Sequence, residues 1–266
     1  MDAVIKVSSA ETGGFWEIPV LYEDPSLLAL DKPSKLFTSP DRDNATLPNL
    51  MKLLHDGIAQ GKPWAEKRAL KYLMNAHRLD FEVSGVILLV KNKAALVKLA
   101  NVFGAEQESR KYLALSRGAP TTDEFLVDAK LAPNPARPGH IRVDRERGKA
   151  ARTKFQVLER FAGWTLLRCE PLTNRIGQIQ AHLQHVALPL AGASSYGGRP
   201  LLLSSLKPNY RLKPGQTERP LISRAALHAE QLVLPHPETN ETLTLTAPMP
   251  KDLTVALKYL RIFAKT

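Results

Sequence analysis

The sequence predicts an α+β fold whose central sheet is mixed but largely antiparallel and is flanked by helices and loops. Several strand-like segments follow one another without a helix between them, as Phe155–Leu158 and Trp164–Cys169 do. A doubly wound parallel sheet needs a crossover, usually a helix, between successive strands. We therefore expect the α+β fold and not a doubly wound one.

Strands are predicted from apolar runs and from alternation. Val86–Val90 is a short, fully apolar run of the kind that forms a buried strand. Arg110–Leu115 has strand character, and leucines alternate with threonines over Thr242–Thr246.

Three segments repeat apolar residues at helical spacing, namely Lys93–Phe103, Gln178–Leu188 and Lys251–Phe263. Thr173 or Asn174 is available to cap the second helix.

Neither an internal repeat nor a low-complexity tract is present. The segment Asn134–Gly139 carries two prolines and a glycine and marks a loop. The segment 199–224 holds four prolines, which predicts a long ordered insertion or a mobile flap. These composition shifts mark loops and no domain boundary, so we expect a single domain.

Positive charge is concentrated in two segments. The chain of 266 residues carries a formal net charge of +11. Arg137–Lys154 has seven basic and two acidic residues, and Arg199–Arg224 has six basic residues and one acidic residue. Such segments on a nearly neutral body indicate a polyanionic partner, with nucleic acid as the leading candidate. The alternative is two solvated loops whose charge serves solubility.

Several classes of protein are excluded by composition. The longest apolar run, Val86–Val90, is far shorter than a membrane span, and the N-terminal residues show no apolar signal segment. With one cysteine, Cys169, the chain has no internal disulfide and no cysteine-based zinc cluster. We expect a soluble cytoplasmic protein.

The stretch from His77 to Gly85 is the most informative candidate for chemistry. Asp80 precedes the predicted buried strand, so its loop is held at one end by the core. Rigid placement of a loop carboxylate is what catalysis requires. The alternative is that Asp80 is only a turn residue before the Ser84-Gly85 corner.

A series of short motifs follows one another along the chain. They are Tyr22-Glu23-Asp24, Asp31-Lys32-Pro33, His77-Arg78-Leu79-Asp80 with Ser84-Gly85, Arg110-Lys111-Tyr112-Leu113-Ala114, Glu170-Pro171-Leu172-Thr173-Asn174-Arg175 with Gln178-Ile179, Tyr196-Gly197, Leu227-His228-Ala229, His236-Pro237 and Ala247-Pro248. In these ordered motifs the chain resembles the RluA-type RNA pseudouridine synthases, from about Pro19 to the C-terminus. Each block alone is weak, but their common order over nearly the whole chain is specific. The resemblance implies a short extension over residues 1–18 and a single catalytic domain over 19–266.

The resemblance implies the pseudouridine synthase fold and the isomerisation of uridine to pseudouridine in structured RNA, either rRNA or tRNA. It implies that Asp80 is the catalytic carboxylate, that Arg175 pairs with it, and that Tyr112 stacks on the flipped base. Neither a cofactor nor a metal is implied, and the family precedent favours a monomer with no membrane or DNA partner. The residues expected to bind RNA are His77, Arg78, Arg142, Arg145, Arg147, Lys149, Arg152, Gln178, Arg211 and Lys213.

Each assignment has a plainer alternative. Tyr112 can be strand packing, and Arg175 can be a solvated cation near a helix start. His182 and His185 have the spacing of metal ligands, but without a third ligand motif we interpret them as helix-surface histidines.

Four positions depart from the family pattern. The usual His and second Arg of the arginine motif are replaced by Gly177 and Gln180, the Thr before Ser-Gly by Val83, and the Asp before Tyr-Gly is absent around Ala193. These changes leave open a second hypothesis, an inactive RNA-binding relative with the same fold. A DNA-binding or ribosome-associated protein with accidental motif matches is a third.

Many relatives carry an S4-type RNA-binding domain before the catalytic domain. Because 21 residues precede Tyr22, we expect no such domain, and the two basic segments become the candidate RNA contacts.

Overall fold

The computed structural model describes residues 3–9, 11–40, 47–213 and 215–265. Contacts divide the chain into two compact units. Unit 1 comprises Met1–Arg110 and Ala229–Pro248, and unit 2 comprises Lys111–His228 and Met249–Thr266. Two strands, β6 (Ser109–Arg117) and β12 (Leu227–Pro235), each run from one unit into the other. That 19–266 forms one catalytic domain stays a prediction.

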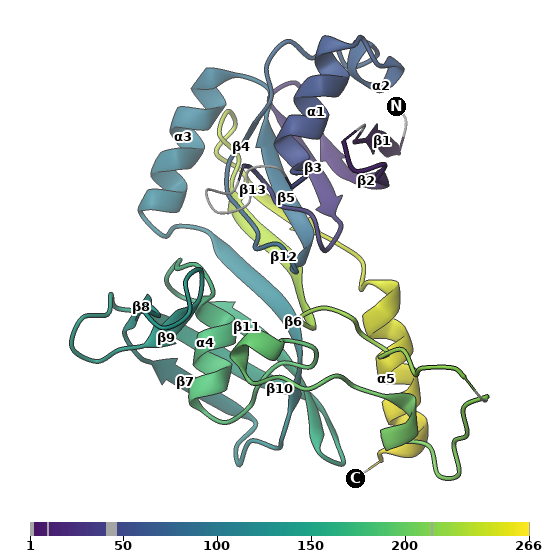
Figure 1. Ribbon diagram of the computed structural model, residues 1–266. Coiled ribbons are helices and arrows are strands. Elements are labelled where there is room, and N and C mark those ends of the chain that lie inside the picture. Colours follow the sequence, from purple (N-terminus) through teal and green to yellow (C-terminus); the bar gives the residue numbers. More distant parts are fainter. Residues whose placement is uncertain (1–2, 10, 41–46, 214, 266) are drawn as a thin grey trace. The chain divides into compact units, whose positions relative to one another are not determined.

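Unit 1 is built on a sheet with the strand order β1-β2-β3-β5-β12; β4 pairs with β5 and β13 with β12 (Figure 1). Residues predicted to be a short extension form β1 and the start of β2. The strands are β1 (Val4–Ser8), β2 (Phe15–Glu23), β3 (Leu27–Lys32), β4 (Met74–Asn75), β5 (Ser84–Val90) and β13 (Thr242–Thr246), and the helices are α1 (Leu50–Ala59), α2 (Pro63–Glu66) and α3 (Lys93–Gly104).

The core of unit 1 forms around β5, every residue of which is buried. Its apolar side chains pack with those of β3, β12 and the inner face of α3. The α3 helix begins where the Asn92 side chain accepts a hydrogen bond from the Ala95 N–H, which satisfies one free amide of its first turn. The predicted strand Val86–Val90 and helix Lys93–Phe103 are confirmed.

Unit 2 contains strands in the order β6-β11-β10-β7 and a separate hairpin, β8-β9. Helix α4 contacts β9, β10 and β11, as Figure 1 shows, and α5 packs its leucines against β6 and β11. The strands are β7 (Glu124–Asp128), β8 (Leu131–Pro133), β9 (Ile141–Val143), β10 (Arg152–Phe161) and β11 (Trp164–Pro171), and the helices are α4 (Gln178–His185) and α5 (Lys251–Phe263).

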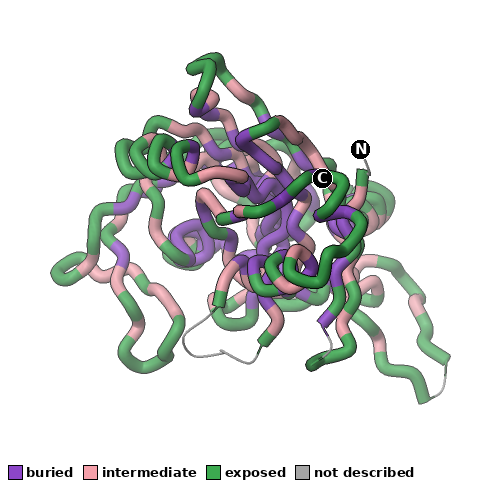
Figure 2. Tube along the Cα trace, turned by 90° about the horizontal axis from the view of Figure 1, so that it is seen from above, coloured by how far each residue is buried: buried purple, intermediate pink, exposed green. Residues whose placement is uncertain are grey.

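Pairings between neighbouring strands are antiparallel wherever a register is defined among the described residues. Figure 2 shows the buried residues inside and exposed residues along the loops. The predicted α+β fold with a largely antiparallel sheet is confirmed. In the described part of the chain, no helix is both long and apolar enough to span a membrane.

Helix α4 differs from its prediction at both ends. It ends at His185 rather than Leu188, because Ala187 adopts a left-handed φ of 58° and Pro189 follows. The predicted cap is wrong as well: Gly177, with φ 62°, occupies the cap position. Thr173 and Asn174 lie four and three residues before this position, too far to cap the first turn, and glycine adopts the left-handed conformation there without steric cost.

The proline-rich segment 199–224 is anchored at both ends. Leu201 and Ile222 are buried in the core of unit 2, and the Leu221 N–H donates to the Leu201 carbonyl at 2.8 Å. Arg224 makes two hydrogen bonds to the Asp252 carboxylate, at 2.8 and 3.1 Å. Its guanidinium is therefore paired within unit 2. Pro214 lies outside the described residues. Among the two alternatives, the described part fits an ordered insertion.

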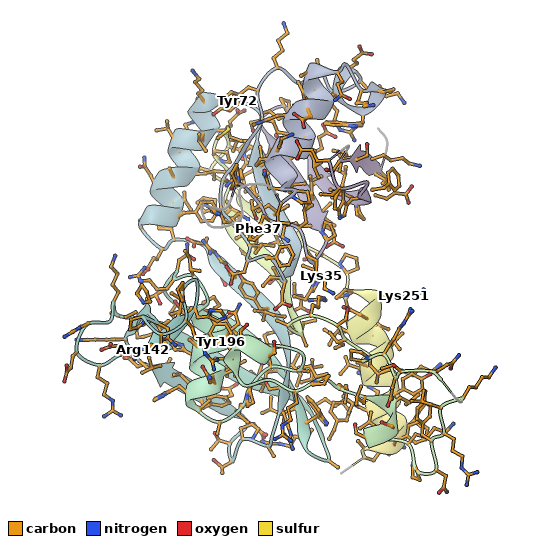
Figure 3. The ribbon with its side chains drawn as sticks, in the orientation of Figure 1. Lys35, Phe37, Tyr72, Arg142, Tyr196 and Lys251 are labelled. Carbon is orange, nitrogen blue, oxygen red and sulfur yellow. The ribbon has the colours of Figure 1, made fainter. Side chains whose placement is uncertain are left out.

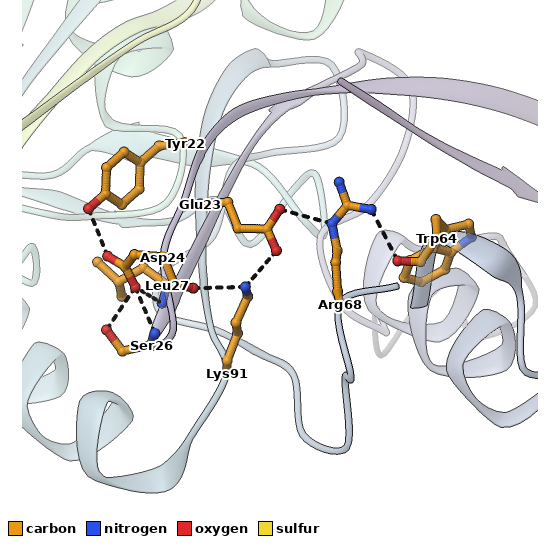
Figure 4. A network of polar contacts seen from close by, with 8 residues as sticks. All are labelled: Tyr22, Glu23, Asp24, Ser26, Leu27, Trp64, Arg68 and Lys91. Atoms are coloured by element: carbon orange, nitrogen blue, oxygen red, sulfur yellow. Dashed lines mark hydrogen bonds and ion pairs between the residues drawn. The ribbon is translucent and has the colours of Figure 1, made fainter. Parts of the chain in front are cut away.

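Unit 1 also holds a buried ionic network around Glu23 (Figure 4). One carboxylate oxygen accepts from Arg68 Nε at 3.0 Å and the other from Lys91 Nζ at 2.6 Å. The neighbouring Asp24 accepts from Tyr22, His236 and two backbone amides. Burial alone would raise the pKa of Asp24, but these hydrogen bonds lower it to about 2. The network joins β2 to the residues that follow α2 and β5.

We expect Glu23→Gln to lower the free energy of unfolding by about 3–5 kcal/mol, because it removes the carboxylate that bonds the enclosed Arg68 and Lys91 side chains. Glu17→Gln is the matched control, since Glu17 pairs with Lys6 at 2.9 Å on an exposed surface, and should cost about 0–1 kcal/mol. Urea unfolding measures both. Equal losses in the two variants would contradict a stabilising role for the Glu23 network.

Candidate active site

Asp80 lies in unit 1 on the loop between β4 and β5. Thr38 holds the residue before it: the Thr38 hydroxyl donates to the Leu79 carbonyl at 3.0 Å and accepts from the Leu79 N–H at 3.1 Å. Both partners are buried. These two bonds bridge residues 41 apart in the sequence. They fix the backbone immediately before the Asp80 carboxylate.

Thr38 is itself positioned by α1. The Leu50 N–H donates to the Phe37 carbonyl at 2.8 Å, and the Met51 N–H donates to the Thr38 carbonyl at 3.0 Å. These amides lie in the first turn of α1, where backbone N–H groups have no partner inside the helix. The Phe37 and Thr38 carbonyls therefore satisfy two free donors of α1, and these hydrogen bonds fix the backbone position of Thr38.

The loop that follows Lys32-Pro33 supports the other side of Asp80. The Lys35 N–H donates to the Phe81 carbonyl at 2.7 Å, and the Phe37 and Phe81 rings are 4.7 Å apart. Figure 3 labels Lys35 and Phe37 on this loop. The buried Lys32 ammonium donates to the Pro33 and Leu36 carbonyls, which curls the loop around it. Asp80 thus has restrained backbone on both sides.

Downstream, the chain is held by a close backbone approach at Gly85. Its φ is 114°, and a Cβ placed there would lie 2.2 Å from the Ala229 carbonyl oxygen. Only glycine fits such a position. The Val83 N–H also donates to the Asp80 carbonyl at 3.1 Å, closing a turn. The Ser84-Gly85 corner is therefore required to bring β5 directly after the Asp80 loop.

His77 is buried rather than displayed for RNA. Its Nε2 accepts a hydrogen bond from the Leu88 N–H at 3.1 Å. Burial lowers the pKa of His77 to about 3, and the nearby Arg110 guanidinium acts in the same direction. A neutral, enclosed imidazole adds no positive charge to a phosphate-binding surface. Arg78, the next residue, is exposed.

Arg175 lies in unit 2 on the loop before α4. It is half-buried, and its Nη1 donates to the Asn174 carbonyl at 2.9 Å. Tyr196 packs close to this loop: a Cβ on Gly177 would lie 2.6 Å from the Tyr196 hydroxyl oxygen. That hydroxyl accepts a hydrogen bond from the Ile141 N–H of β9 at 3.2 Å. Glycine at 177 is thus matched to the tyrosine beside it.

Gln178 and His182 are both buried on α4. The Gln178 amide donates to the Arg152 carbonyl and to the Thr153 hydroxyl, so it is used within the protein. The interpretation of His182 as a helix-surface residue is wrong: both of its ring nitrogens bond inside unit 2, to Thr153 and to the Ala129 carbonyl. His185 is exposed, as expected. The described residues contain no cluster of three or more metal-ligating side chains.

Tyr112 lies on β6 with 9% of its surface exposed and is in register with Cys169 of β11. Cys169 is fully buried, and burial raises the pKa of its thiol. A protonated, enclosed thiol is not a nucleophile. The prediction that Cys169 is a small strand residue is confirmed.

The basic residues of the β8-β9 hairpin and its flanks are solvent-exposed. The turn that follows β9 is shaped by Asp144, whose carboxylate accepts from the Glu146 and Arg147 N–H groups and from Arg142. These hydrogen bonds, with the Arg147 amide first among them, lower the pKa of Asp144. Figure 3 labels Arg142 on this hairpin. The exposed cations predicted to bind RNA here are Arg142, Arg145, Arg147, Lys149 and Arg152, and those in the insertion are Arg211 and Lys213.

The predicted catalytic residues fall in both units: Asp80 in unit 1, and Tyr112 and Arg175 in unit 2. That Arg175 pairs with Asp80 stays a prediction. Within unit 2, Tyr196 joins the Arg175 loop to the basic hairpin.

Comparison with protein families matches residues 26–185 to RNA pseudouridylate synthase. The chain belongs to the RNA pseudouridylate synthase family. The predicted resemblance is confirmed, and the protein is an RNA pseudouridine synthase, an isomerase that converts uridine to pseudouridine in RNA.

Curated relatives of this synthase match nearly its whole length. It is 34% identical to "Ribosomal large subunit pseudouridine synthase C" of Escherichia coli K12, over 91% of this chain and 70% of the relative. It is 32% identical, with the same coverage, to "Ribosomal large subunit pseudouridine synthase D" of Pasteurella multocida. Human RNA Pseudouridylate Synthase Domain Containing 4 has the same fold, with a TM-score of 0.66 at 22% identity over 91% of this chain and 92% of that one.

Sequence reasoning missed the residues that hold the Asp80 loop. Thr38 and Lys35 act through a hydroxyl and a backbone amide, and neither lies in a pattern that marks a contact with a distant loop. Thr153 and His182 were missed for the same reason. The 3.6-residue spacing of the apolar residues in α4 shows which face is buried, but it does not predict a polar partner on that face.

We expect Gly177→Ala to destabilise the synthase by about 1–3 kcal/mol, because it combines a left-handed φ with the loss of the Tyr196 hydroxyl position. Gly163→Ala is the matched control, since Gly163 also has a positive φ but open space around it. Urea unfolding should give a smaller loss for the control. A Tyr196→Phe background should reduce the Gly177 penalty; an unchanged penalty would contradict the close approach.

Proposed function

We propose that this pseudouridine synthase modifies specific uridines of large-subunit rRNA and that Asp80 is its catalytic carboxylate. The substrate class is supported by the names of the two ribosomal large-subunit synthases that share 32–34% identity with this chain over most of its length. The role of Asp80 is supported by its place on a loop restrained by Thr38, Lys35 and the Gly85 corner. We propose further that it acts as a cytoplasmic monomer and needs no cofactor.

The reaction is an isomerisation in which atoms are conserved. A uridine flips out of the RNA, its N1–C1′ bond breaks, the base turns, and C5 bonds to C1′. The C5 proton is released and N1 acquires a proton. Asp80 either attacks C1′ or removes the C2′ proton, and both routes require an ionised carboxylate held against the ribose. Restrained backbone on both sides of Asp80 serves either route, because its geometry is set before RNA binds.

Arg175 and Tyr112 complete the proposed site. Arg175 would keep Asp80 ionised and oriented by pairing with it. Its Nε is buried and makes no hydrogen bond within the described residues, so that donor is available for a carboxylate. Tyr112 would stack on the flipped base with the face of its ring.

RNA affinity is assigned to the exposed cations rather than to His77 and Gln178. Those two side chains hydrogen-bond within the protein, and we propose structural roles for them. The exposed Arg78 and the cations of the hairpin and the insertion would neutralise phosphates.

We expect Asp80→Asn to lower the rate of pseudouridine formation by at least about 10²-fold while leaving RNA affinity within a few-fold of wild type. The substrate is unmodified large-subunit rRNA transcribed in vitro, and pseudouridine is mapped by mass spectrometry. Glu82→Gln, two residues away, is the control for loop charge and should stay active. Activity of Asp80→Asn equal to wild type would overturn the site. Wild type that binds rRNA yet modifies none would favour an inactive relative.

Neutralising β9 and the turn after it with Arg142→Gln, Arg145→Gln and Arg147→Gln should weaken rRNA binding and flatten its salt dependence. Each lost phosphate contact reduces the slope of log K against log salt by about 0.7–0.9. The control removes three exposed cations elsewhere, with Lys93→Gln, Lys98→Gln and Lys258→Gln. If both triple variants show the wild-type slope, the hairpin is only a solvated loop.

A further inference from the structure

A buried chain of polar contacts crosses unit 2 beneath the Arg175 loop. His182, on α4, is fully buried and faces Thr153 of β10. Its Nδ1 lies 2.9 Å from the Thr153 hydroxyl, and its Nε2 lies 3.1 Å from the Ala129 carbonyl. The Thr153 hydroxyl is also 3.0 Å from the Gln178 amide nitrogen. Four groups from three segments thus form one line of contacts.

The donors and acceptors in this line fit together in one way. The Ala129 carbonyl can only accept, so Nε2 of His182 carries the proton and Nδ1 accepts. The Thr153 hydroxyl then donates to Nδ1 and accepts from the Gln178 amide. Every member is satisfied with a neutral imidazole. Burial lowers the pKa of His182, the Ala129 carbonyl and Asp128 oppose this, and His185 adds to it.

At one end the chain reaches the segment that carries Arg175. The Gln178 carbonyl oxygen accepts from the Thr173 hydroxyl at 2.9 Å, and that hydroxyl accepts from the Arg152 N–H at 3.0 Å. The Gln178 amide also donates to the Arg152 carbonyl at 2.9 Å. Thr173 lies two residues before Arg175. The contacts therefore fasten the beginning of the arginine loop to β10.

At the other end the chain reaches the root of the basic hairpin. Ala129 lies between β7 and β8, and its N–H donates to the Ala151 carbonyl at 3.1 Å. Leu131 and Lys149 exchange two backbone hydrogen bonds, at 2.8 and 2.9 Å, just above it. Leu131, Ala151 and Ala181 form a small apolar cluster that encloses this root. The imidazole of His182 thus connects the hairpin base to α4.

We propose that Thr153, His182 and Gln178 are positioning residues that hold the basic hairpin in register with the Arg175 loop. This proposal rests on the function proposed above, in which the hairpin grips RNA and Arg175 orients the catalytic carboxylate. Two segments that act on the same RNA must keep a fixed spacing, because a displacement of about 1 Å can cost a rate about 10²-fold. A fully satisfied buried polar network supplies that rigidity.

Thr153→Val tests the proposal, because it keeps the shape of the side chain and removes only the hydroxyl. Thr153→Ser restores the hydroxyl, and His185→Gln, on the exposed face of the same helix, is the control. Wild type and these three variants are assayed with unmodified large-subunit rRNA transcript for kcat, KM and the salt dependence of binding. Thermal unfolding gives the folded fraction of each protein. We expect Thr153→Val to lower kcat about 10- to 100-fold per folded molecule, with Thr153→Ser and His185→Gln close to wild type.

Other outcomes separate the proposal from its basis. If Thr153→Val is less stable but has the wild-type kcat and KM per folded molecule, the chain of contacts is purely structural and the proposal is overturned. If Thr153→Ser is as impaired as Thr153→Val, the hydroxyl is not the cause and the proposal also fails. If wild type itself makes no pseudouridine in this RNA, the proposed rRNA function fails instead. The wild-type assay alone reveals that outcome.

Discussion

The Asp80 loop of unit 1 depends on one side chain, the Thr38 hydroxyl, which bonds both backbone groups of Leu79. A loop that carries a carboxylate cannot rely on strand hydrogen bonds for its geometry, so its order must come from elsewhere. Thr38 supplies it, and the first amides of α1 hold Thr38 in turn. Each of these bonds contributes only about 1 kcal/mol, yet together they remove the backbone freedom that would otherwise move Asp80.

A similar principle operates in unit 2, where the segment with Arg175 is fastened by side chains and not by regular structure. Gln178, Thr153 and His182 make this connection through a line of buried contacts, and Tyr196 makes a second one from the hairpin to Gly177. The departure from the usual histidine at 177 is therefore part of the local packing. Gln180, where relatives usually carry arginine, is also buried, with 8% exposed. Asp80, Tyr112 and Arg175 keep the residue types that the resemblance assigns to the site.

Local patterns predicted the parts of the fold that local patterns can specify. The apolar run before Val90 predicted β5, and the spacing of leucines predicted α3 and α5. Ordered motifs predicted the family and pointed to Asp80. The predicted cap of α4 was wrong because the cap position needs a left-handed backbone, which Gly177 supplies and which composition does not reveal. The prediction that His182 lies on the helix surface was wrong because its partners, Thr153 and Ala129, lie on other segments. The burial of a histidine depends on such partners.

The central claim is that the Asp80 loop is ordered before any RNA is bound. Amide hydrogen exchange of the RNA-free protein tests it most directly, at the Leu79 N–H that donates to Thr38. We expect this amide to be protected to a degree similar to the buried amides of β5, because it opens only when the Thr38 contact and its α1 anchor are lost. Exchange of the Leu79 amide at the rate of an unprotected loop would contradict the account.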